Sequence, residues 1–475
     1  MVLELRLRLQ LTLRTKAFME NSNFHHALQI KENLCVGCSH CMDVCPTEAI
    51  RIRNGKALLI DNKCVDCGEC FRVCPVNAII IDHDDFSKIF KYKYRVALVP
   101  MVFVGQFAEE VARKHIYSAL LETGFTHIQE VEEGVEVLKQ SIIHSQSAEE
   151  AKPLISSFCP AIVRLIQVKF PGLVNNIMLL KPPLDISALY IRKKLLEEGA
   201  GEDEIGIFYI TPCAAKIAAI KSPVGEDYSS ITGVINMDFI FNKVYQNYKH
   251  SKADTCTVPE ITLLSSMAVK WSLTHGEAAN VSGRALAIDE IHNVIEFLEK
   301  IESDEITDID FLELRACDES CAGGVLTVVN RFLTTERLNK LASSLPVENN
   351  TATPTAMENL STYLLERISI GKVHPRSMLK LDENMAVAMK KMDMVREILP
   401  CLPMVDCGAC GAPTCQALAQ DIVQGQADLE HCFFVQKRME NNLEFTSEDS
   451  MRKLTEIWGK EKFGLICKRK TTHES

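Results

Sequence analysis

The sequence predicts a multidomain protein whose central domain is α/β, with parallel sheets flanked by helices. A small α+β domain is predicted before it and a small helical domain after it. Two observations support this fold class. Between residues 92 and 140, short apolar runs alternate with segments of helical period, which is the pattern of βαβ units in a parallel sheet. In addition, the 19 cysteines gather mainly in closely spaced runs near the two ends of the chain.

The elements of the central domain follow from apolar runs and from the polar stretches between them. A helix is predicted around 109–123, and loops at 222–230, 246–255 and 347–355, where polar residues cluster. The predicted strands are 95–100, 127–131, 154–158, 205–211, 285–288 and 311–316.

We expect six segments along the 475 residues, which at roughly 100 to 200 residues per domain suffice for two to four domains. They are a leader at 1–22, predicted to be disordered; an N-terminal domain at 23–90; the central domain at 91–346; a helical linker at 347–395; a four-cysteine domain at 396–440; and a charged helical tail at 441–475.

The composition excludes several classes of protein. With 47% hydrophobic and 24% charged residues, the chain is typical of a soluble globular protein. Its 52 basic and 63 acidic residues give a net charge of −11, so we expect no nucleic-acid partner, which would need a basic face. No run of about 18 apolar residues predicts a membrane span. The closely spaced cysteines are unsuited to unstrained disulfides and indicate a reducing compartment, so we expect a cytoplasmic protein.

The N-terminal cysteines form a repeat of the pattern C-x2-C-x2-C-x3-C-P, CVGCSHCMDVCP and CVDCGECFRVCP. A 4Fe-4S cluster needs four converging thiolates; a short loop supplies three, and the fourth comes from the other repeat. A zinc module is the alternative, but it would ask for two separate tetrahedral sites. Residues 34–80 closely resemble the two-cluster bacterial ferredoxins, which implies electron transfer. The predicted ligand sets are Cys35, Cys38, Cys41 and Cys74 for one cluster, and Cys64, Cys67, Cys70 and Cys45 for the other.

Four cysteines of the central domain are predicted to converge. Cys159, Cys213 and Cys317 each follow an apolar strand, and parallel sheets place ligands at this edge. Cys321 lies four residues after Cys317 and is followed by two glycines, which allow an inorganic group to approach the backbone. The alternative is that these cysteines are buried as small hydrophobic residues.

The segments SSFCP, TPCAAK and RACDESCAGG around these cysteines resemble the three signature segments of the FeFe-hydrogenase catalytic domain. The resemblance implies two lobes around a 4Fe-4S cubane held by the four cysteines. It also implies that Cys321 bridges to a di-iron subsite carrying CO and cyanide. By the same resemblance Lys216 would hydrogen-bond a cyanide, which suits an ammonium group facing an anionic ligand.

The chain departs from the family pattern at several positions. Phe158 stands where the family has a proton-carrying cysteine, and Thr211 and Arg315 replace two methionines. Arg315 either faces inward, where its charge would change the cluster potential, or faces solvent. Glu133 and Glu136 lie at helical i, i+3 spacing in a region comparable to the family's acidic proton relay, although we favour an exposed helix face.

A third cysteine motif, C-x2-C-x4-C-x16-C, lies in the C-terminal region, with a helix predicted at 416–424. Short glycine loops and uneven spacing favour a 4Fe-4S cluster over zinc, the alternative. The segment resembles the small four-cysteine domain of corrinoid iron-sulfur proteins. Its predicted ligands are Cys407, Cys410, Cys415 and Cys432, and the cysteines left as ordinary thiols are Cys256, Cys401 and Cys467.

We therefore expect an FeFe-hydrogenase-like iron-sulfur protein of the sensory or regulatory type, with weak or no hydrogen turnover. Loss of the relay cysteine suits a sensor better than a fast catalyst, because turnover depends on proton transfer. Two alternatives stay open: an electron-transfer protein with an ordinary 4Fe-4S cluster in the central site, and an active ferredoxin-linked hydrogenase. The expected partners are redox proteins or a downstream signalling protein, with hydrogen as a ligand. The chain contains no nucleotide-binding fingerprint.

Overall fold

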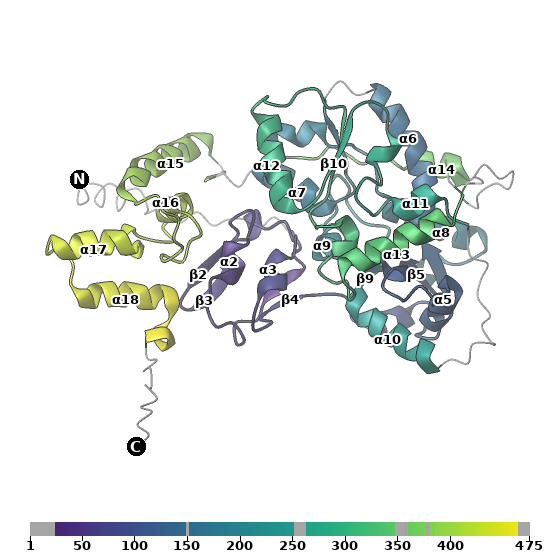
Figure 1. Ribbon diagram of the computed structural model, residues 1–475, viewed down its shortest axis with the longest axis horizontal. Coiled ribbons are helices and arrows are strands. Elements are labelled where there is room, and N and C mark those ends of the chain that lie inside the picture. Colours follow the sequence, from purple (N-terminus) through teal and green to yellow (C-terminus); the bar gives the residue numbers. More distant parts are fainter. Residues whose placement is uncertain are drawn as a thin grey trace, which may run out of the picture.

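The computed structural model describes residues 24–148, 152–250, 263–346, 357, 360–376, 381–382 and 384–463. Figure 1 shows a small N-terminal domain in the middle, with the large central domain on one side of it and the C-terminal helices on the other. The leader, the boundary segment at 347–355, Cys256 and Cys467 lie outside the described residues. In the described part of the chain, no helix is both long and apolar enough to cross a bilayer.

The N-terminal domain repeats one small unit, in which a cysteine loop runs into a short helix and then a strand. The first unit contains α2 (His40–Asp43) and the hairpin of β2 (Ile50–Arg53) with β3 (Lys56–Leu59). The second contains α3 (Glu69–Val73) and β4 (Ile79–Ile81), which pairs antiparallel with β1 (Leu28–Ile30). The predicted α+β class of this domain is confirmed.

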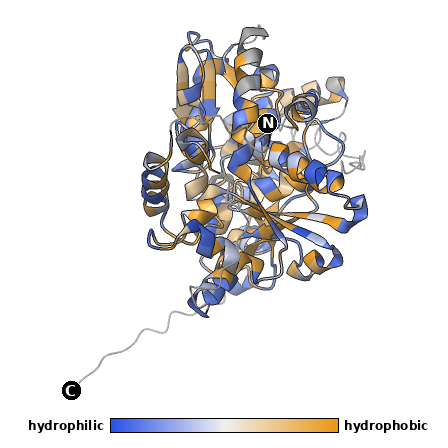
Figure 2. Ribbon diagram, turned by 90° about the vertical axis from the view of Figure 1, so that its right-hand side faces the viewer, coloured by the Kyte–Doolittle hydropathy of each residue, from blue (hydrophilic) through white to orange (hydrophobic). Residues whose placement is uncertain are grey.

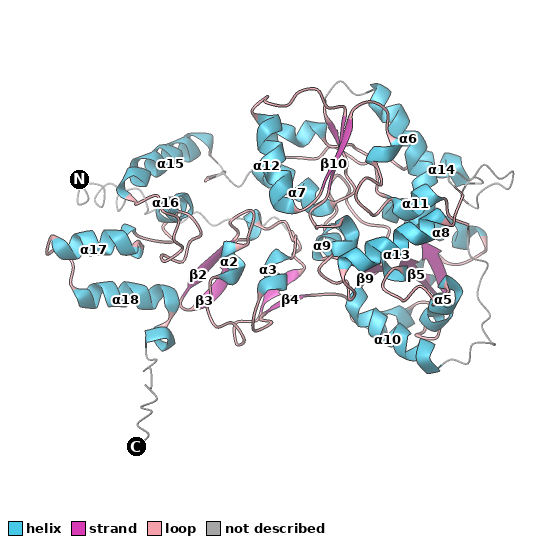
Figure 3. Cartoon of the chain, in the orientation of Figure 1, coloured by secondary structure: helices cyan, strands magenta, loops and turns pink. Residues whose placement is uncertain are grey.

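The central domain has two parallel sheets, and Figure 3 shows their strands among the covering helices. The order of the larger sheet is β6 (His127–Glu130), β5 (Tyr94–Val99), β8 (Ile205–Thr211) and β9 (Gly233–Asn236). The order of the smaller sheet is β10 (Ala285–Ile288), β11 (Phe311–Leu314) and β7 (Leu154–Ile155). All seven residues of β8 are buried, as expected for a strand covered on both faces. The predicted α/β class is confirmed.

Amphipathic helices cover both sheets, and Figure 2 shows hydrophobic colour running along the strands. In α12 the buried residues recur at helical spacing, from Ile291 through Val294, Ile295 and Leu298 to Ile301. The helices of the domain are α4 (Met101–Val104), α5 (Arg113–Leu121), α6 (Val135–Ala148), α7 (Pro160–Lys169), α8 (Pro183–Glu197), α9 (Ala214–Lys221), α10 (Met237–His250), α11 (Ser266–Lys270), α12 (Ile291–Glu302) and α13 (Arg331–Ser343), and α14 (Ser361–Leu365) follows it.

The C-terminal region is helical, as predicted. It consists of α15 (Met385–Ile398), α16 (Cys415–Val423), α17 (Phe433–Asn441) and α18 (Ser447–Trp458). Thr414 caps α16 by accepting a hydrogen bond from the Ala417 amide at 3.0 Å, so this helix begins directly after a cysteine loop. A separate hydrophobic core contains Cys410, Cys415 and Cys432, which brings widely spaced cysteines into one small domain.

Candidate metal centres

Four cysteines of the central domain lie near one another. Cys159 follows β7 and caps α7, whereas Cys213 follows β8 and caps α9. Cys317 follows β11, and Cys321 lies in the 3-10 turn Ser320–Gly323. Burial raises the pKa of Cys317 well above its ordinary value, and the charges of Cys213, Cys159 and Cys321 raise it further. The cysteines therefore follow strands of both sheets.

Lys216 points its ammonium group at this group of thiols. It lies in the first turn of α9, is 8% exposed, and its Nζ is 3.5 Å from the Cys321 Sγ. The Nζ also lies 4.8 Å from the centre of the Phe158 ring and 5.9 Å from that of Tyr209. Burial opposes its charge, but nearby thiolates, Cys321 first, outweigh burial and raise the pKa of Lys216 well above its usual value. A buried cation beside a thiol is suited to an anionic ligand.

Phe158 and Arg315 form a buried stack next to the thiols. Phe158 is 6% exposed, Arg315 is 1% exposed, and the Arg315 Cζ lies 4.1 Å from the ring centre. Arg315 NH2 forms ion pairs with Glu277 Oε2 at 2.7 Å and with Glu313 Oε1 at 3.5 Å. The inward orientation of Arg315 is therefore confirmed. Its guanidinium and the ammonium of Lys216 both lie against the Phe158 ring.

The two carboxylates that hold Arg315 are fixed by further hydrogen bonds. Ser156 Oγ donates to Glu277 Oε2 at 2.6 Å, and the amides of Glu277 and Ala278 donate to Glu313 Oε2 at 2.9 and 2.8 Å. Burial raises the pKa of Glu277, and the charge of Arg315 opposes this rise. Sequence reasoning missed both glutamates, because neither belongs to a motif and their partners lie on other elements.

A cavity of about 110 Å³ adjoins Cys321. Phe158 and Lys216 line it together with Glu132 and Asp185, which were not predicted as site residues. Burial raises the pKa of Glu132 to about 8 and that of Asp185 to about 6. The cavity thus combines apolar walls with a few buried charged groups, as is usual for sites that bind small ligands.

The predicted acidic pair does not form an exposed helix face. Glu136 and Glu133 are both half-buried, and Glu136 Oε1 accepts a hydrogen bond from Ser265 Oγ at 2.7 Å. The interpretation as an exposed face was wrong, because α11 contacts the turn at Val131–Gly134 and its N-cap residue Ser265 bonds Glu136. It is the neighbouring Glu132, 2% exposed, whose side chain reaches the cavity.

The thiols of the N-terminal domain lie near one another in two groups. Burial raises the pKa of Cys41 to about 12, and the charges of Cys38, Cys35 and Cys74 raise it further. The second group shares Cys45 from the first repeat, since its charge raises the pKa values of Cys64, Cys67 and Cys70 after burial. In each group, three thiols thus come from one repeat and the fourth from the other.

The C-terminal thiols also form one group. Burial raises the pKa of Cys410 to about 11, and Cys432 and Cys407 lie near enough to raise it further. His431, the histidine at zinc-ligand spacing, instead accepts a hydrogen bond on its Nδ1 from the Asp428 amide at 3.0 Å. Cys401 is directed elsewhere, toward the Glu397 carbonyl at 3.9 Å.

These donor sets fit iron-sulfur clusters. Each group is built mainly of thiols, and clustered cysteine thiolates are the ordinary ligands of such clusters. In the second N-terminal group, possible ligand atoms of His26 and Asp66 also lie within 4.8 Å of the Cys64 thiol, but they are bonded to each other. The cavity with Lys216 adjoins the central group. The ligand roles of the individual cysteines stay predictions.

The second thiol group of the N-terminal domain lies against the central site. A Cβ added to Gly68, between Cys67 and Cys70, would lie 2.7 Å from the Val325 side chain. Arg72 donates to the Gly323 carbonyl at 2.8 Å, so the loop of the second repeat contacts the loop after Cys321. A buried ion pair also joins the two domains: Asp66 of the second repeat lies 2.7 Å from Arg164 of α7.

Three family models match the chain in the order of these sites. Residues 27–76 match the 4Fe-4S dicluster domain, residues 93–238 the iron only hydrogenase large subunit, C-terminal domain, and residues 402–434 the FeS family of Fe-S clusters. No curated protein sequence matches the chain at a significant level.

Solved structures of FeFe-hydrogenases are also similar to the chain. One is a variant of HydA1 from Chlamydomonas reinhardtii, with 14% identity and a TM-score of 0.45 over 60% of this chain and 96% of that one. A structure described in terms of oxygen inactivation of the H cluster has 15% identity and a TM-score of 0.45, with 60% and 96% covered. The structure of HydA(deltaEFG), described in terms of stepwise H-cluster assembly, has 14% identity and a TM-score of 0.43, with 61% and 98% covered.

The family models contain all the predicted ligand cysteines of the first and third regions in which the thiols gather. In the central region the match ends at residue 238, so it contains Cys159 and Cys213 but not Cys317 and Cys321. The chain is therefore hydrogenase-like in its central region: a region that matches the 4Fe-4S dicluster domain precedes the region that matches the iron only hydrogenase large subunit, and a region that matches an Fe-S cluster family follows it.

Proposed function

We propose that this protein is a sensory member of the hydrogenase-like proteins, which responds to hydrogen or to redox state and passes electrons but turns hydrogen over slowly. The observation that carries the proposal is the Phe158–Arg315 stack beside the predicted ligands Cys159 and Cys321. Fast turnover needs a group of matched pKa within reach of the reacting centre. A phenyl ring neither donates nor accepts a proton.

The surroundings of Phe158 strengthen this argument. The guanidinium of Arg315 and the ammonium of Lys216 lie on the ring, 4.1 and 4.8 Å from its centre. Two fixed positive charges disfavour a third, so they oppose the passage of a proton along this side of the site. Slow proton delivery would let the centre keep a redox state long enough to report it.

Sixteen cysteines would hold four iron-sulfur clusters in this proposal, two in the ferredoxin domain, one in the central domain and one in the C-terminal domain. Bound at the central cysteines, a di-iron subsite would supply the chemistry of hydrogen cleavage. The residues of this chain would hold and orient it: Cys321 as its attachment, Lys216 as donor to an anionic ligand, and the cavity walls as a barrier to water.

The external partners in this proposal are a redox protein, which exchanges electrons with the ferredoxin or C-terminal domain, and a downstream signalling protein. Hydrogen is the proposed small ligand of the central site. The cavity beside Cys321 and Lys216 supports this part of the proposal, because it is small and largely apolar.

The experiment that tests the di-iron subsite is an infrared spectrum of the anaerobically purified, matured protein, in the region where metal-bound CO and cyanide absorb. Bands that shift under hydrogen are expected. A full complement of iron without such bands would contradict the proposal and leave an electron-transfer protein with an ordinary 4Fe-4S cluster in the central site.

A pair of substitutions tests the role assigned to Phe158. In protein that shows the infrared bands, Phe158→Cys should increase hydrogen turnover, because it restores a thiol where the ring now stands. Phe158→Ala is the matched control, since it also removes the ring but supplies no group that carries protons. Equal turnover in both variants, or fast turnover in the unmodified protein, would contradict slow proton delivery as the reason for a sensory role.

A further inference from the structure

The C-terminal Fe-S domain contacts the ferredoxin domain through a continuous seam of backbone hydrogen bonds. The Ile52 amide donates to the Gly411 carbonyl at 2.9 Å, and the Asn54 amide donates to the Glu456 carbonyl at 2.7 Å. The Gly55 amide donates to the Ile457 carbonyl at 2.9 Å. Strand β2 and its turn therefore bind both the cysteine loop and helix α18 of the C-terminal domain.

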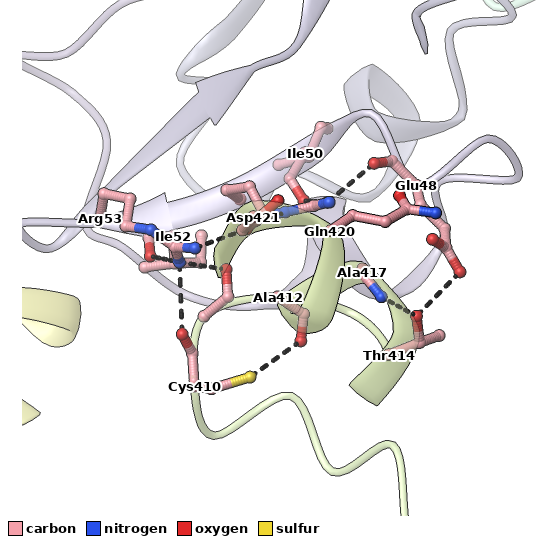
Figure 4. A network of polar contacts seen from close by, with 12 residues as sticks. Glu48, Ile50, Ile52, Arg53, Cys410, Ala412, Thr414, Ala417, Gln420 and Asp421 are labelled. Atoms are coloured by element: carbon pink, nitrogen blue, oxygen red, sulfur yellow. Dashed lines mark hydrogen bonds and ion pairs between the residues drawn. The ribbon is translucent and has the colours of Figure 1, made fainter. Parts of the chain in front are cut away.

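Buried ion pairs hold the same seam, as Figure 4 shows. Asp421 of α16 accepts from Arg51 Nε and Arg53 NH2, each at 2.7 Å, and Asp421 and Arg51 are 3% and 2% exposed. Arg53 NH1 also donates to the carbonyls of Cys410 and Gly411 at 3.2 and 2.8 Å. Buried, charge-assisted hydrogen bonds with good geometry fix the relative orientation of two domains more strongly than exposed surface ion pairs do.

The seam brings one particular thiol group of the ferredoxin domain to the C-terminal thiols. A Cβ added to Gly408, between Cys407 and Cys410, would lie 3.1 Å from the Met42 Cε, and Met42 directly follows Cys41. Trp458 Nε1 donates to the Ala409 carbonyl at 3.0 Å, in the same loop.

A second contact involves the same thiol group. A Cβ on Gly55 would lie 2.8 Å from the Trp458 carbonyl oxygen, and a Cβ on Gly37, between Cys35 and Cys38, would collide with the Gly55 carbonyl oxygen. The first cysteine loop thus contacts the β2–β3 turn, and this turn contacts the end of α18.

The loop of the other thiol group contacts Val325 and Gly323 of the central domain through Gly68 and Arg72. On its other side, Lys63, which precedes Cys64, donates to Gln420 Oε1 of α16 at 3.0 Å. Figure 1 shows the ferredoxin domain between its two neighbours. Among the cysteines in the described part of the chain, Cys407 alone is exposed, and it lies in the C-terminal group. The loops of the thiol groups therefore contact one another from the central domain through the ferredoxin domain to the C-terminal domain, where Cys407 reaches solvent.

We propose that the C-terminal domain is the outer terminus of the electron path. Its site at Cys407, Cys410, Cys415 and Cys432 exchanges electrons with the site at Cys35, Cys38, Cys41 and Cys74, and only through the ferredoxin domain with the central site. Each exchange is a one-electron step: the donor site is oxidised by one electron, the acceptor site is reduced by one, and no bond forms or breaks. This proposal deepens the proposed function and rests on it for the presence of the clusters.

The test is electron paramagnetic resonance of the full-length, dithionite-reduced protein, in which neighbouring reduced clusters split or broaden each other's signals. Cys38→Ala and Cys67→Ala are a matched pair, because both remove the second cysteine of a repeat. The splitting on the C-terminal signal should be lost in Cys38→Ala and kept in Cys67→Ala. Loss in Cys67→Ala with retention in Cys38→Ala, or no splitting in the unmodified protein, would overturn the proposed order.

A second pair of variants leaves every cysteine in place. Gly55 and Gly199 have positive φ angles, +71° and +94°, so alanine strains both backbones alike. Gly55→Ala also drives a methyl group into the seam, whereas the Cβ of Gly199→Ala meets nothing within 4 Å. The splitting should weaken only in Gly55→Ala, at unchanged iron content; equal splitting in both variants would contradict the seam's role. Absence of the infrared CO and cyanide bands would refute the sensory function but leave this result intact.

Discussion

Arg315 is a single residue that changes the electrostatics of the central site. The guanidinium is buried, stacks on Phe158, and has its charge stabilised by Glu277 and Glu313. Its electrostatic interactions extend to Cys321 and Cys159. A methionine at this position, as in the hydrogenase pattern, would carry no charge. The substitution therefore adds a permanent positive charge next to the predicted cluster ligands.

We predict that Arg315→Met lowers the midpoint potential of the central site. A nearby positive charge favours the reduced, more negative state, so its removal favours the oxidised state. Arg315→Lys keeps the charge and is the control. Potentiometric titration of the spectroscopic signal of the central site measures the midpoint potential of each variant. Equal potentials in both variants and in the unmodified protein would show that the charge of Arg315 does not affect the central site.

The raised pKa of buried Glu132 leads us to predict that the stability of the protein depends on pH. Glu132 accepts a hydrogen bond on its Oε1 from the Met101 amide at 2.9 Å, and burial raises its pKa from 4.5 to about 8. Between these two values the folded state keeps the proton and the unfolded state releases it, so the contribution of Glu132 to stability falls as the pH rises through this window. Below 4.5 and above 8 it is constant.

Glu132→Gln should remove this part of the pH dependence, because glutamine has a similar shape and does not titrate. The expected change in slope is at most about 1.4 kcal/mol per pH unit. Anaerobic urea unfolding at several pH values measures it. Glu130, whose pKa burial raises to about 7, remains in the variant and sets the residual slope. Identical slopes in the two proteins would refute the role of Glu132.

The site residues that sequence reasoning found either belong to closely spaced cysteine runs or directly follow an apolar strand. The cysteine runs predicted the thiol groups, since ligands two to four positions apart act within one loop. Glu277 and Glu313 were missed because their partners, such as Ser156 and Arg315, are brought to them by folding. The inward orientation of Arg315 was likewise undecided, because a strand-end residue faces the core or solvent according to what packs on it.

At the scale of elements, β8 and β10 begin and end at the predicted residues, because each is a continuous apolar run between polar segments. Strand β7 is shorter than predicted, since the chain leaves the sheet at Ser156 to bring Cys159 to α7. Strand β9 was not predicted: it is a four-residue run after a polar loop, and its extended form is fixed by pairing with β8.

The contact of helix α16 with the ferredoxin domain can be tested through Asp421. Asp421→Ala should destabilise the seam by about 3–5 kcal/mol, because it leaves the buried guanidinium of Arg51 without its partner. Amide hydrogen exchange at Ile52, Asn54 and Gly55 measures the effect as faster exchange. The control is Asp393→Ala, whose ion pair with Arg396 is exposed and contributes less than about 1 kcal/mol. Equal exchange in both variants would mean that Asp421 does not hold the seam.

At the scale of the whole molecule, the ferredoxin domain is the middle of three domains and has a different contact on each side. Toward the C-terminal domain the contact is backbone hydrogen bonds and the Asp421 ion pairs. Toward the central domain it is the buried pair of Asp66 with Arg164, together with Val65, which packs in the core beside β7 and α7. The two contacts share no residue, so each should be separable by mutation.

Arg164→Leu should open the central contact alone. Asp66 is fully buried, and its Oδ2 also lies 2.9 Å from His26 Nδ1, so loss of the guanidinium leaves a buried carboxylate without its buried ion-pair partner, with His26 in contact and Arg376 nearby. We expect a destabilisation of about 3–5 kcal/mol. Amide hydrogen exchange should accelerate at Ala27, which donates to Asp66 Oδ1, and not at Asn54 in the opposite seam.

The control for this variant is Arg367→Leu, because the ion pair of Arg367 with Glu366 is exposed. Asp421→Ala should give the reciprocal pattern: amide exchange becomes faster at Asn54 and is unchanged at Ala27. Acceleration at both positions in either variant would mean that the three domains unfold as one cooperative unit, and that the electron path cannot be interrupted at one contact without loss of the other.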